Sequence, residues 1–249
     1  MKREKLRDDR EFDTTQLHQT QHGQSLHRDY SAHFWRWSFA RRLITVKDTV
    51  LEIGCGQDRP LSKILTAGAQ PHVKHYTGVD LNKLKSSESQ RLTFMGEFNI
   101  IDDWKQLKKQ CPEGYDVLVH FEVIEHMHQK HGLPFLKICR SLLKPGGRMV
   151  MSTPCYDGKR HAANHIHEYT IEELGGVARK AGFTITNRFG TFMDIKHIGK
   201  PSTLTTDQSR SVQEVYALLS KYYDSDALSC FFAPLYPDQS RNNVWVCHT

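Results

Sequence analysis

The stretch that decides the fold of this chain is Thr49-Val50-Leu51-Glu52-Ile53-Gly54-Cys55-Gly56-Gln57-Asp58. A short apolar run leads into two glycines, and a helix-compatible segment, 61–67, follows them. Strand, tight turn and helix in this order are typical of the opening unit of a parallel α/β sheet. Gly54 and Gly56 permit positive φ and let a ligand lie against bare backbone. Asp58 stands where a dinucleotide site prefers a third glycine, and its charge would repel a pyrophosphate.

Length and composition indicate one large globular domain. The chain has 249 residues, of which 38% are hydrophobic and 25% are charged, enough for a full core. Its formal net charge of +6 permits an anionic partner without demanding one. No apolar run is long enough for a membrane span. The six cysteines are dispersed with no C-x-x-C, which favours reduced thiols and a cytoplasmic location; they are Cys55, Cys111, Cys139, Cys155, Cys230 and Cys247.

Two further strands are expected after the glycine turn, each ending at an acid. Residues 75–80 form a short apolar run that ends at Asp80, about 24 residues beyond the glycines. This spacing suits the acid that accepts hydrogen bonds from both hydroxyls of a ribose. Residues 92–98 predict the third strand, with Glu97 and Phe98 at its end.

The second informative stretch is 115–154. An apolar strand beginning at Tyr115 runs into Glu122-Val123-Ile124-Glu125-His126. A helix is expected over 133–143, followed by a sharp turn at Lys144-Pro145-Gly146-Gly147 and a strand over 148–154.

Together, the glycine turn, Asp80, Glu-x-x-Glu-His and Lys-Pro-Gly-Gly resemble the class I S-adenosylmethionine-dependent methyltransferases. The resemblance covers about 47–190. It implies a Rossmann-like, doubly wound α/β fold with a mostly parallel seven-stranded sheet whose last strand is antiparallel. It also implies S-adenosylmethionine as cofactor, with Asp80 on the ribose, Glu97 on the adenine amino group and Phe98 beside the ring; Asp102 and Asp103 are the competing acids for the place of Glu97. The cofactor-binding residues that it implies are Glu52, Gly54, Cys55, Gly56, Asp80, Leu81, Glu97, Phe98, Phe121 and Glu122.

The remaining segments give the domain organisation. Thr170 and Glu173 form a capping box, so a helix is expected over 170–181. Helical spacing of Phe34, Trp37 and Ile44 predicts an amphipathic helix before the first strand. The expected division is a polar N-terminal tail 1–29 and a methyltransferase domain 30–249, made of a lid helix 30–45, a core 47–190, an insertion of about 191–240 and a closing strand 243–247.

Histidines are concentrated in two loops expected at the ligand-binding edge of the sheet, and two roles are open for them. In the first, His126, His165 or His167 is a general base that takes the proton of an acceptor hydroxyl. In the second, Glu122, Glu125, His126 and His165 hold a divalent ion, Mg, Mn or Zn. Glu-x-x-Glu-His with a later histidine also resembles small-RNA 3′-terminal 2′-O-methyltransferases and quinone-biosynthesis O-methyltransferases.

The acceptor expected first is a small molecule with a sugar, phenol or natural-product hydroxyl, because His167-Glu168-Tyr169-Thr170 resembles the small-molecule branch of the family. RNA or DNA is the alternative acceptor, with a metal-dependent 2′-O reaction as one form of it. A non-catalytic protein that binds the cofactor or a partner is the alternative from another class. The oligomeric state is left open.

Overall fold

The computed structural model describes residues 21–22, 25–26, 30–67, 71–84, 87–159, 161–200 and 204–249. Most of the predicted tail 1–29 therefore lies outside the described residues. Within it, Gln21–His22 (β1) and Ser25–Leu26 (β2) pair as a two-stranded antiparallel sheet.

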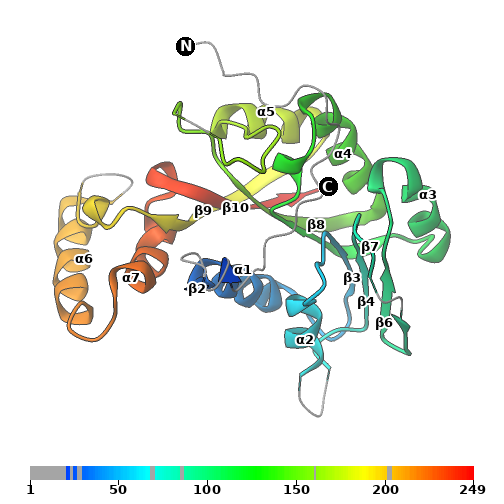
Figure 1. Cartoon of the computed structure of the whole chain (residues 1–249), viewed down its shortest axis with the longest axis horizontal. Coiled ribbons are helices and arrows are strands. Elements are labelled where there is room, and N and C mark those ends of the chain that lie inside the picture. Colours follow the sequence, from blue (N-terminus) through cyan, green and yellow to red (C-terminus); the bar gives the residue numbers. More distant parts are fainter. Residues whose placement is uncertain are drawn as a thin grey trace.

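A single large sheet runs through the molecule in the order β5-β6-β4-β3-β7-β8-β10-β9 (Figure 1). Its strands are β3 Thr49–Ile53, β4 His75–Val79, β5 Ser87–Glu88, β6 Leu92–Met95, β7 Tyr115–Phe121, β8 Leu143–Pro154, β9 Thr184–Met193 and β10 Ser240–His248. The strands β6, β4, β3, β7 and β8 are parallel neighbours, and β10 lies antiparallel between β8 and β9. The predicted sheet of seven strands with an antiparallel last strand is confirmed, and the two-residue strand β5 adds an eighth at the edge.

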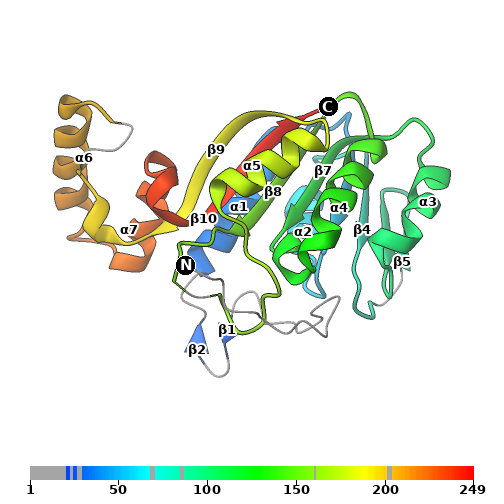
Figure 2. The ribbon, with the colours of Figure 1, turned by 90° about the horizontal axis from the view of Figure 1, so that it is seen from above.

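Helices cover both faces of the sheet, as the doubly wound prediction requires (Figures 1 and 2). The helices are α1 Tyr30–Leu43, α2 Pro60–Thr66, α3 Ile100–Gln110, α4 Gln129–Leu142, α5 Ile171–Lys180, α6 Thr206–Leu219 and α7 Ser225–Phe232. Apolar side chains of α3, α4 and α5 build the main core on one face, and those of α1 and α2 build a second cluster on the other. The insertion adds a small separate cluster around Phe232 and Tyr236.

Two local predictions are wrong in detail. Lys144 to Gly147 were expected as a turn between elements, but they form an irregularity inside β8, where Gly146 has φ +74°. In α1, Phe34 was expected on the packed side, yet it is 50% exposed, whereas Arg36 is buried beside Trp37. The helix α1 contacts α2 and α7 as well as the sheet, so more than one of its sides is covered. The spacing of apolar residues, which assumes one buried side, therefore wrongly predicted Phe34 to be buried.

The insertion is shorter than expected at both ends. The strand β9 continues to Met193 and β10 begins at Ser240, so the predicted insertion 191–240 loses residues to these two strands, and the predicted closing strand 243–247 lies inside the longer β10. Three short 3₁₀ turns, Ile195–His197, Ala233–Leu235 and Pro237–Gln239, join the helices of the insertion to the sheet. None of the helices in the described ranges has the length and apolarity that crossing a lipid bilayer demands.

Candidate active site

The glycine turn after β3 has the conformation that its sequence predicts. Gly54 and Gly56 have φ of +75° and +66°, in the left-handed region that disfavours a side chain. A Cβ on Gly54 would also lie 2.5 Å from a methyl of Val123, so the turn packs directly under the residues that follow β7. The prediction of a turn with positive φ at both glycines is confirmed.

Asp80 follows β4, next to this turn. Its Oδ2 accepts a hydrogen bond of 2.9 Å from the Gly56 backbone N–H, and its Oδ1 accepts one of 2.9 Å from the Asn82 N–H. The carboxylate therefore links the ends of two neighbouring strands, β3 and β4. Because charged acceptors strengthen such bonds, Asp80 fixes the shape of the edge where a ligand would lie.

Glu52 is buried on β3 and does not reach solvent. It lies opposite Gly78 in the β3–β4 pair, which places it diagonal to Tyr76, and the Tyr76 hydroxyl donates to its carboxylate. Burial raises the pKa of Glu52 to about 8, the Tyr76 hydrogen bond opposes this rise, and the charge of Asp80 adds to it. Glu52 is therefore mostly protonated and neutral near pH ~7, so no second buried negative charge lies close to Asp80.

The other residues implied for the cofactor occupy different environments. The side chain of Cys55 is buried in the cluster beneath α1 and α2, and Phe98 is buried in the main core. Glu97 is exposed with φ +53°, and its N–H donates to Asn82 O at 3.0 Å. Leu81 and Phe121 are half-buried at the ends of β4 and β7.

Glu122 stands at the end of β7 with φ +57°, a strained conformation for a side chain other than glycine. Its carboxylate accepts hydrogen bonds from Ser152 Oγ at 2.6 Å and Asn242 Nδ2 at 2.8 Å, and Arg36 Nη1 lies 3.7 Å away. Burial alone would raise the pKa of Glu122, but Arg36 and these hydrogen bonds outweigh burial and lower it. Glu122 is thus an ionised group whose two oxygens are already bonded.

Three of the four residues predicted as metal ligands come together. Ligand atoms of Glu125, His126 and His165 lie within 4.8 Å of one another, and Glu122 is not part of this group. Glu125 is fully buried; its Oε2 accepts from Thr153 Oγ1 at 2.9 Å, whereas its Oε1 has no hydrogen-bond partner among the residues that the structure describes. Burial raises the pKa of Glu125 to about 8, the charge of Glu122 adds to the rise, and His165 opposes it.

Both histidine rings of this cluster are oriented by oxygen atoms. Nδ1 of His126 lies 3.0 Å from the Asn164 carbonyl oxygen, and Nδ1 of His165 lies 2.6 Å from Glu168 Oε1. Since a carbonyl and an ionised carboxylate only accept, Nδ1 carries the proton and the lone pair of each neutral ring lies on Nε2. The two rings are perpendicular to each other, edge to face, with 5.1 Å between their centroids.

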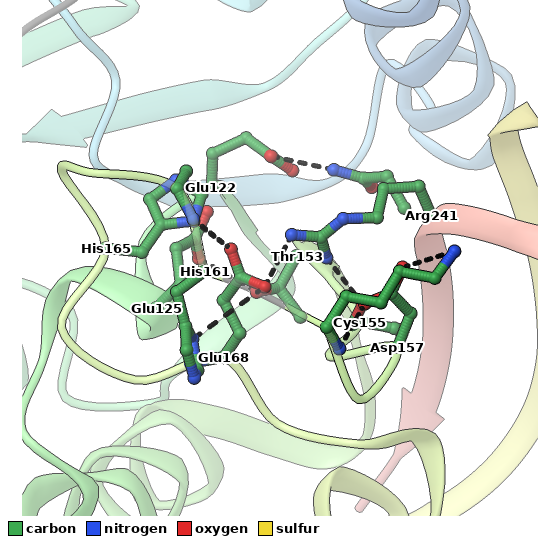
Figure 3. A network of polar contacts seen from close by, with 12 residues as sticks. Glu122, Glu125, Thr153, Cys155, Asp157, His161, His165, Glu168 and Arg241 are labelled. Atoms are coloured by element: carbon green, nitrogen blue, oxygen red, sulfur yellow. Dashed lines mark hydrogen bonds and ion pairs between the residues drawn. The ribbon is translucent and has the colours of Figure 1, made fainter. Parts of the chain in front are cut away.

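Glu168 connects the histidine loop to the sheet (Figure 3). It is fully buried; besides the bond from His165, its Oε2 accepts one of 2.6 Å from Arg241 Nη2 on β10. Burial alone would raise the pKa of Glu168, but His165 and Arg241 lower it to about 2. Glu168 therefore stays ionised and holds the ring of His165 in place.

The third predicted base, His167, lies outside the cluster. Its ring is mostly buried and packs edge-on against Tyr169 at 4.4 Å between centroids. Its backbone N–H donates to the carbonyl oxygen of Glu125, so it helps to seat the loop under the cluster.

No local pattern in the sequence points to the partners that organise this site. Glu168 was noticed only as part of a family-like motif, and Arg241 precedes the closing strand with no pattern around it. Arg36 lies on the predicted lid helix, and no periodicity distinguishes it from the other polar residues there. The pairing of Arg241 with Glu168 spans 73 positions, which no local pattern reports.

A family model described as a methyltransferase domain matches residues 27–187, more than half of the chain. The chain therefore belongs to this methyltransferase-domain family, and the resemblance seen in its motifs is confirmed.

Curated relatives and solved structures agree with this assignment. The chain is 27% identical over 163 residues to the Ubiquinone biosynthesis O-methyltransferase of Stutzerimonas stutzeri (strain A1501), covering 57% of this chain and 66% of the relative. Matches to two further proteins of that name span 48% and 44% of their lengths, so the chain corresponds to about half to two thirds of these relatives.

Two solved structures share the fold. A SAM-dependent methyltransferase from Archaeoglobus fulgidus has a TM-score of 0.55 at 16% identity, covering 88% of this chain and 95% of that one. The 1,6-didemethyltoxoflavin-N1-methyltransferase of Burkholderia thailandensis, solved with bound 1,6-didemethyltoxoflavin and S-adenosylhomocysteine, has a TM-score of 0.53 at 17% identity, covering 88% of this chain and 78% of that one. At these identities the likeness shows the fold alone.

Proposed function

We propose that this chain transfers a methyl group from S-adenosylmethionine to a hydroxyl of a small molecule. The observation that carries the proposal is that the glycine turn, Asp80 and Glu125–His126 follow three adjacent strands, β3, β4 and β7, and that the loop after the next strand, β8, brings His165 to the same place. In a parallel α/β sheet, this edge is where ligands bind. The sulfonium of the cofactor supplies the reactivity, and the protein aligns the acceptor and receives its proton.

In this proposal, Gly54 and Gly56 let the cofactor approach the backbone, and Asp80 accepts hydrogen bonds from its ribose. Glu97, exposed just past the end of β6, would lie on the adenine side, whereas Phe98 is buried in the main core and would support this edge from beneath rather than touch the ring. Glu122 stays ionised and lies close to the glycine turn, because its neighbour Val123 packs against Gly54. Its negative charge would attract the positive sulfonium of the cofactor. The side chains of Glu52 and Cys55 are buried, so they would shape the turn rather than touch the cofactor.

We further propose that Glu125, His126 and His165 hold a divalent ion, Mg, Mn or Zn. Two features indicate that these residues could bind an ion. The buried Oε1 of Glu125 has no hydrogen-bond partner among the described residues. In addition, oxygen atoms hydrogen-bonded to Nδ1 of His126 and His165 leave the Nε2 lone pair of each ring available as a ligand. One carboxylate with two histidines is a known catalytic donor set. When bound, such an ion would lower the pKa of an acceptor hydroxyl.

The metal-free alternative uses one of the same histidines as a general base. His126 and His165 are the better placed, because both rings lie at the cluster with Glu125, whereas His167 packs against Tyr169. Glu168 would orient His165 and stabilise its protonated form after it takes the hydroxyl proton.

The acceptor class rests on the His-Glu-Tyr-Thr segment and on the name of the curated relatives, which act in ubiquinone biosynthesis. Nucleic acid is kept as the alternative acceptor. The proposed location is the cytoplasm, where the six thiols, five of them buried, would stay reduced.

The test combines binding and turnover. Calorimetry with S-adenosylhomocysteine should show binding, and absence of binding at millimolar ligand would exclude the enzyme in favour of a non-catalytic protein. Radiolabelled cofactor should then label an extract of small phenolic and sugar metabolites; label in RNA or DNA instead would support the alternative acceptor.

Metal removal separates the two catalytic schemes. With the ion, EDTA should abolish turnover, and added Mg, Mn or Zn should restore it. His165→Ala should reduce metal content while cofactor affinity is retained, and His197→Ala, outside the cluster, should change neither. Full activity in EDTA, with no metal by elemental analysis, would contradict the metal scheme.

A further inference from the structure

The helix α6 stands apart from the rest of the molecule, at the end of the chain's long axis (Figures 1 and 2). One of its sides packs on the small cluster of the insertion through Val212, Tyr216 and Leu219. Of its fourteen residues, all of them described, Ser209 alone is buried. Most of the helix surface therefore faces away from the protein's own core.

A second apolar stripe runs along this outward surface. Val215, Leu218 and Tyr222 are 44%, 54% and 74% exposed, and they continue from Ser211 at spacings of four, three and four residues. Past Leu219, where α6 ends, one further right-handed turn follows: Ser220 has αR backbone angles, and the Tyr223 N–H donates to Leu219 O at 3.0 Å. Spacings of three and four residues put such side chains on one seam, as in two-stranded helix pairs. A solitary surface helix would carry polar residues there.

The charges beside this seam are self-complementary. Glu214 and Lys221 are exposed, seven residues apart, on the same flank of the seam. When two copies of such a helix pair antiparallel, equivalent flanking positions seven residues apart face each other. Glu214 of one copy then meets Lys221 of the other, and the twofold axis repeats the pair at the opposite end.

We infer that α6 is a dimerisation surface, which pairs antiparallel with α6 of a second copy of this chain. In this arrangement Val215 packs on Leu218 of the second copy, and Ser211 lies under Tyr222. The exposed Tyr223 adds apolar area at each end. We infer a second copy of this chain as the partner because Glu214 and Lys221 of one copy would meet Lys221 and Glu214 of an antiparallel second copy.

The predicted dimer is of moderate strength. Four seam positions per copy bury less area than an obligate interface, so we expect a dissociation constant in the micromolar range, roughly 1–100 μM. The inference does not depend on the proposed methyl transfer, because no seam residue belongs to the candidate active site.

Sedimentation equilibrium of the full chain gives the first test. The monomer is 28.8 kDa, so a dimer of twice that mass, 57.6 kDa, should appear as concentration rises. A single 28.8 kDa species up to roughly 1 mM would overturn the inference.

Substitutions then locate the interface. Leu218→Glu, at an exposed position that should not disturb folding, is expected to weaken dimerisation at least about tenfold. The matched control is Arg210→Glu, since Arg210 is exposed and lies five positions from Val215, about 140° around the helix. A dimer that is unaffected by Leu218→Glu would place the interface elsewhere and overturn the inference.

A mixing experiment tests the orientation. Glu214→Lys alone sets Lys against Lys at both ends of the dimer, and Lys221→Glu alone sets Glu against Glu, so each variant should dimerise roughly tenfold more weakly. Mixed together, the two variants should form a heterodimer, because both facing pairs become opposite in charge. Failure of the mixture to recover the wild-type dimerisation constant would contradict the antiparallel pairing.

Discussion

At the scale of single residues, Asp80 connects the two turns on which the proposed cofactor site depends. Its two carboxylate oxygens accept from the backbone of Gly56 and Asn82, so one side chain shapes the ends of two strands. A residue in this position supports the site and would also bind the ribose. Its substitution therefore tests both roles.

We expect Asp80→Asn to weaken binding of S-adenosylhomocysteine at least about tenfold, because the amide replaces charge-assisted hydrogen bonds by weaker neutral ones. Calorimetry measures the dissociation constant, and circular dichroism checks that the fold survives. The control is Asp58→Asn, an exposed acid in the same turn, which should leave binding unchanged. An unaltered affinity in Asp80→Asn would show that the ribose lies elsewhere.

His120 is a residue whose burial has a consequence for stability. It is fully buried on β7 against Phe135, and neither ring nitrogen has a hydrogen-bond partner among the described residues. Burial lowers the pKa of His120 to about 3, with a small opposing effect of Glu122. The unfolded chain, with an ordinary value near ~6.5, takes up this proton first as the pH falls.

The free energy of unfolding should therefore decrease as the pH drops below ~6.5, by about 2 kcal/mol at pH ~5 from His120 alone. In His120→Leu this contribution should vanish, because the apolar side chain binds no proton. Urea unfolding at several pH values measures the slope. His72→Gln, at a half-buried histidine outside the sheet, should keep the wild-type slope; an equal slope in His120→Leu would contradict the assignment.

At the scale of elements, α5 and α6 begin with the same N-terminal capping motif but contribute differently to the fold. Thr170 and Thr205 are N-caps, each completed by a capping box with the residue three positions on. The helix α5 then packs Leu174 and Ala178 into the main core, whereas α6 contributes only to the small cluster of the insertion. The Thr170 cap also ends the loop that carries His165.

Thr170→Ala should lower the free energy of global unfolding by about 1 kcal/mol, since the lost cap belongs to a helix that unfolds with the core. Thr205→Ala removes the same hydrogen bond from a helix that can open on its own, so its effect on global unfolding should be smaller. Urea denaturation of dilute protein compares the two variants. Equal losses would mean that α6 unfolds together with the sheet.

At the scale of the whole molecule, stability should be graded from the centre of the sheet to the insertion. The strands β3, β7 and β8 lie between other strands and are covered by helices on both faces, whereas α6 lies at the periphery. Amide hydrogens exchange by local opening where few buried contacts hold the backbone.

Hydrogen exchange followed by mass spectrometry should therefore find the slowest amides in β3, β7 and β8 and much faster exchange over 206–219 in dilute protein. S-adenosylhomocysteine should slow exchange around 54–56 and 80–82 and leave α6 unchanged. Ligand protection confined to α6 or α7 would contradict the proposed cofactor site.

The sequence by itself determined the features that depend on neighbouring residues. Gly54 and Gly56 signalled a turn with positive φ, Thr170 and Glu173 signalled a helix start, and the alternation of strands and helices signalled a doubly wound sheet. These signals are readable because backbone sterics and helix capping act over a few residues. The cofactor roles of the residues around them stay predictions.

Only the tertiary structure decided which distant groups meet. The strand β10 enters the sheet between β8 and β9, and this placement brings Arg241 to Glu168 and Asn242 to Glu122. It also leaves Glu122 bonded away from the Glu125–His126–His165 group, although the four residues had been predicted as one set. Such contacts depend on strand order and burial over many tens of positions, where hydrophobic period and turn chemistry carry no information.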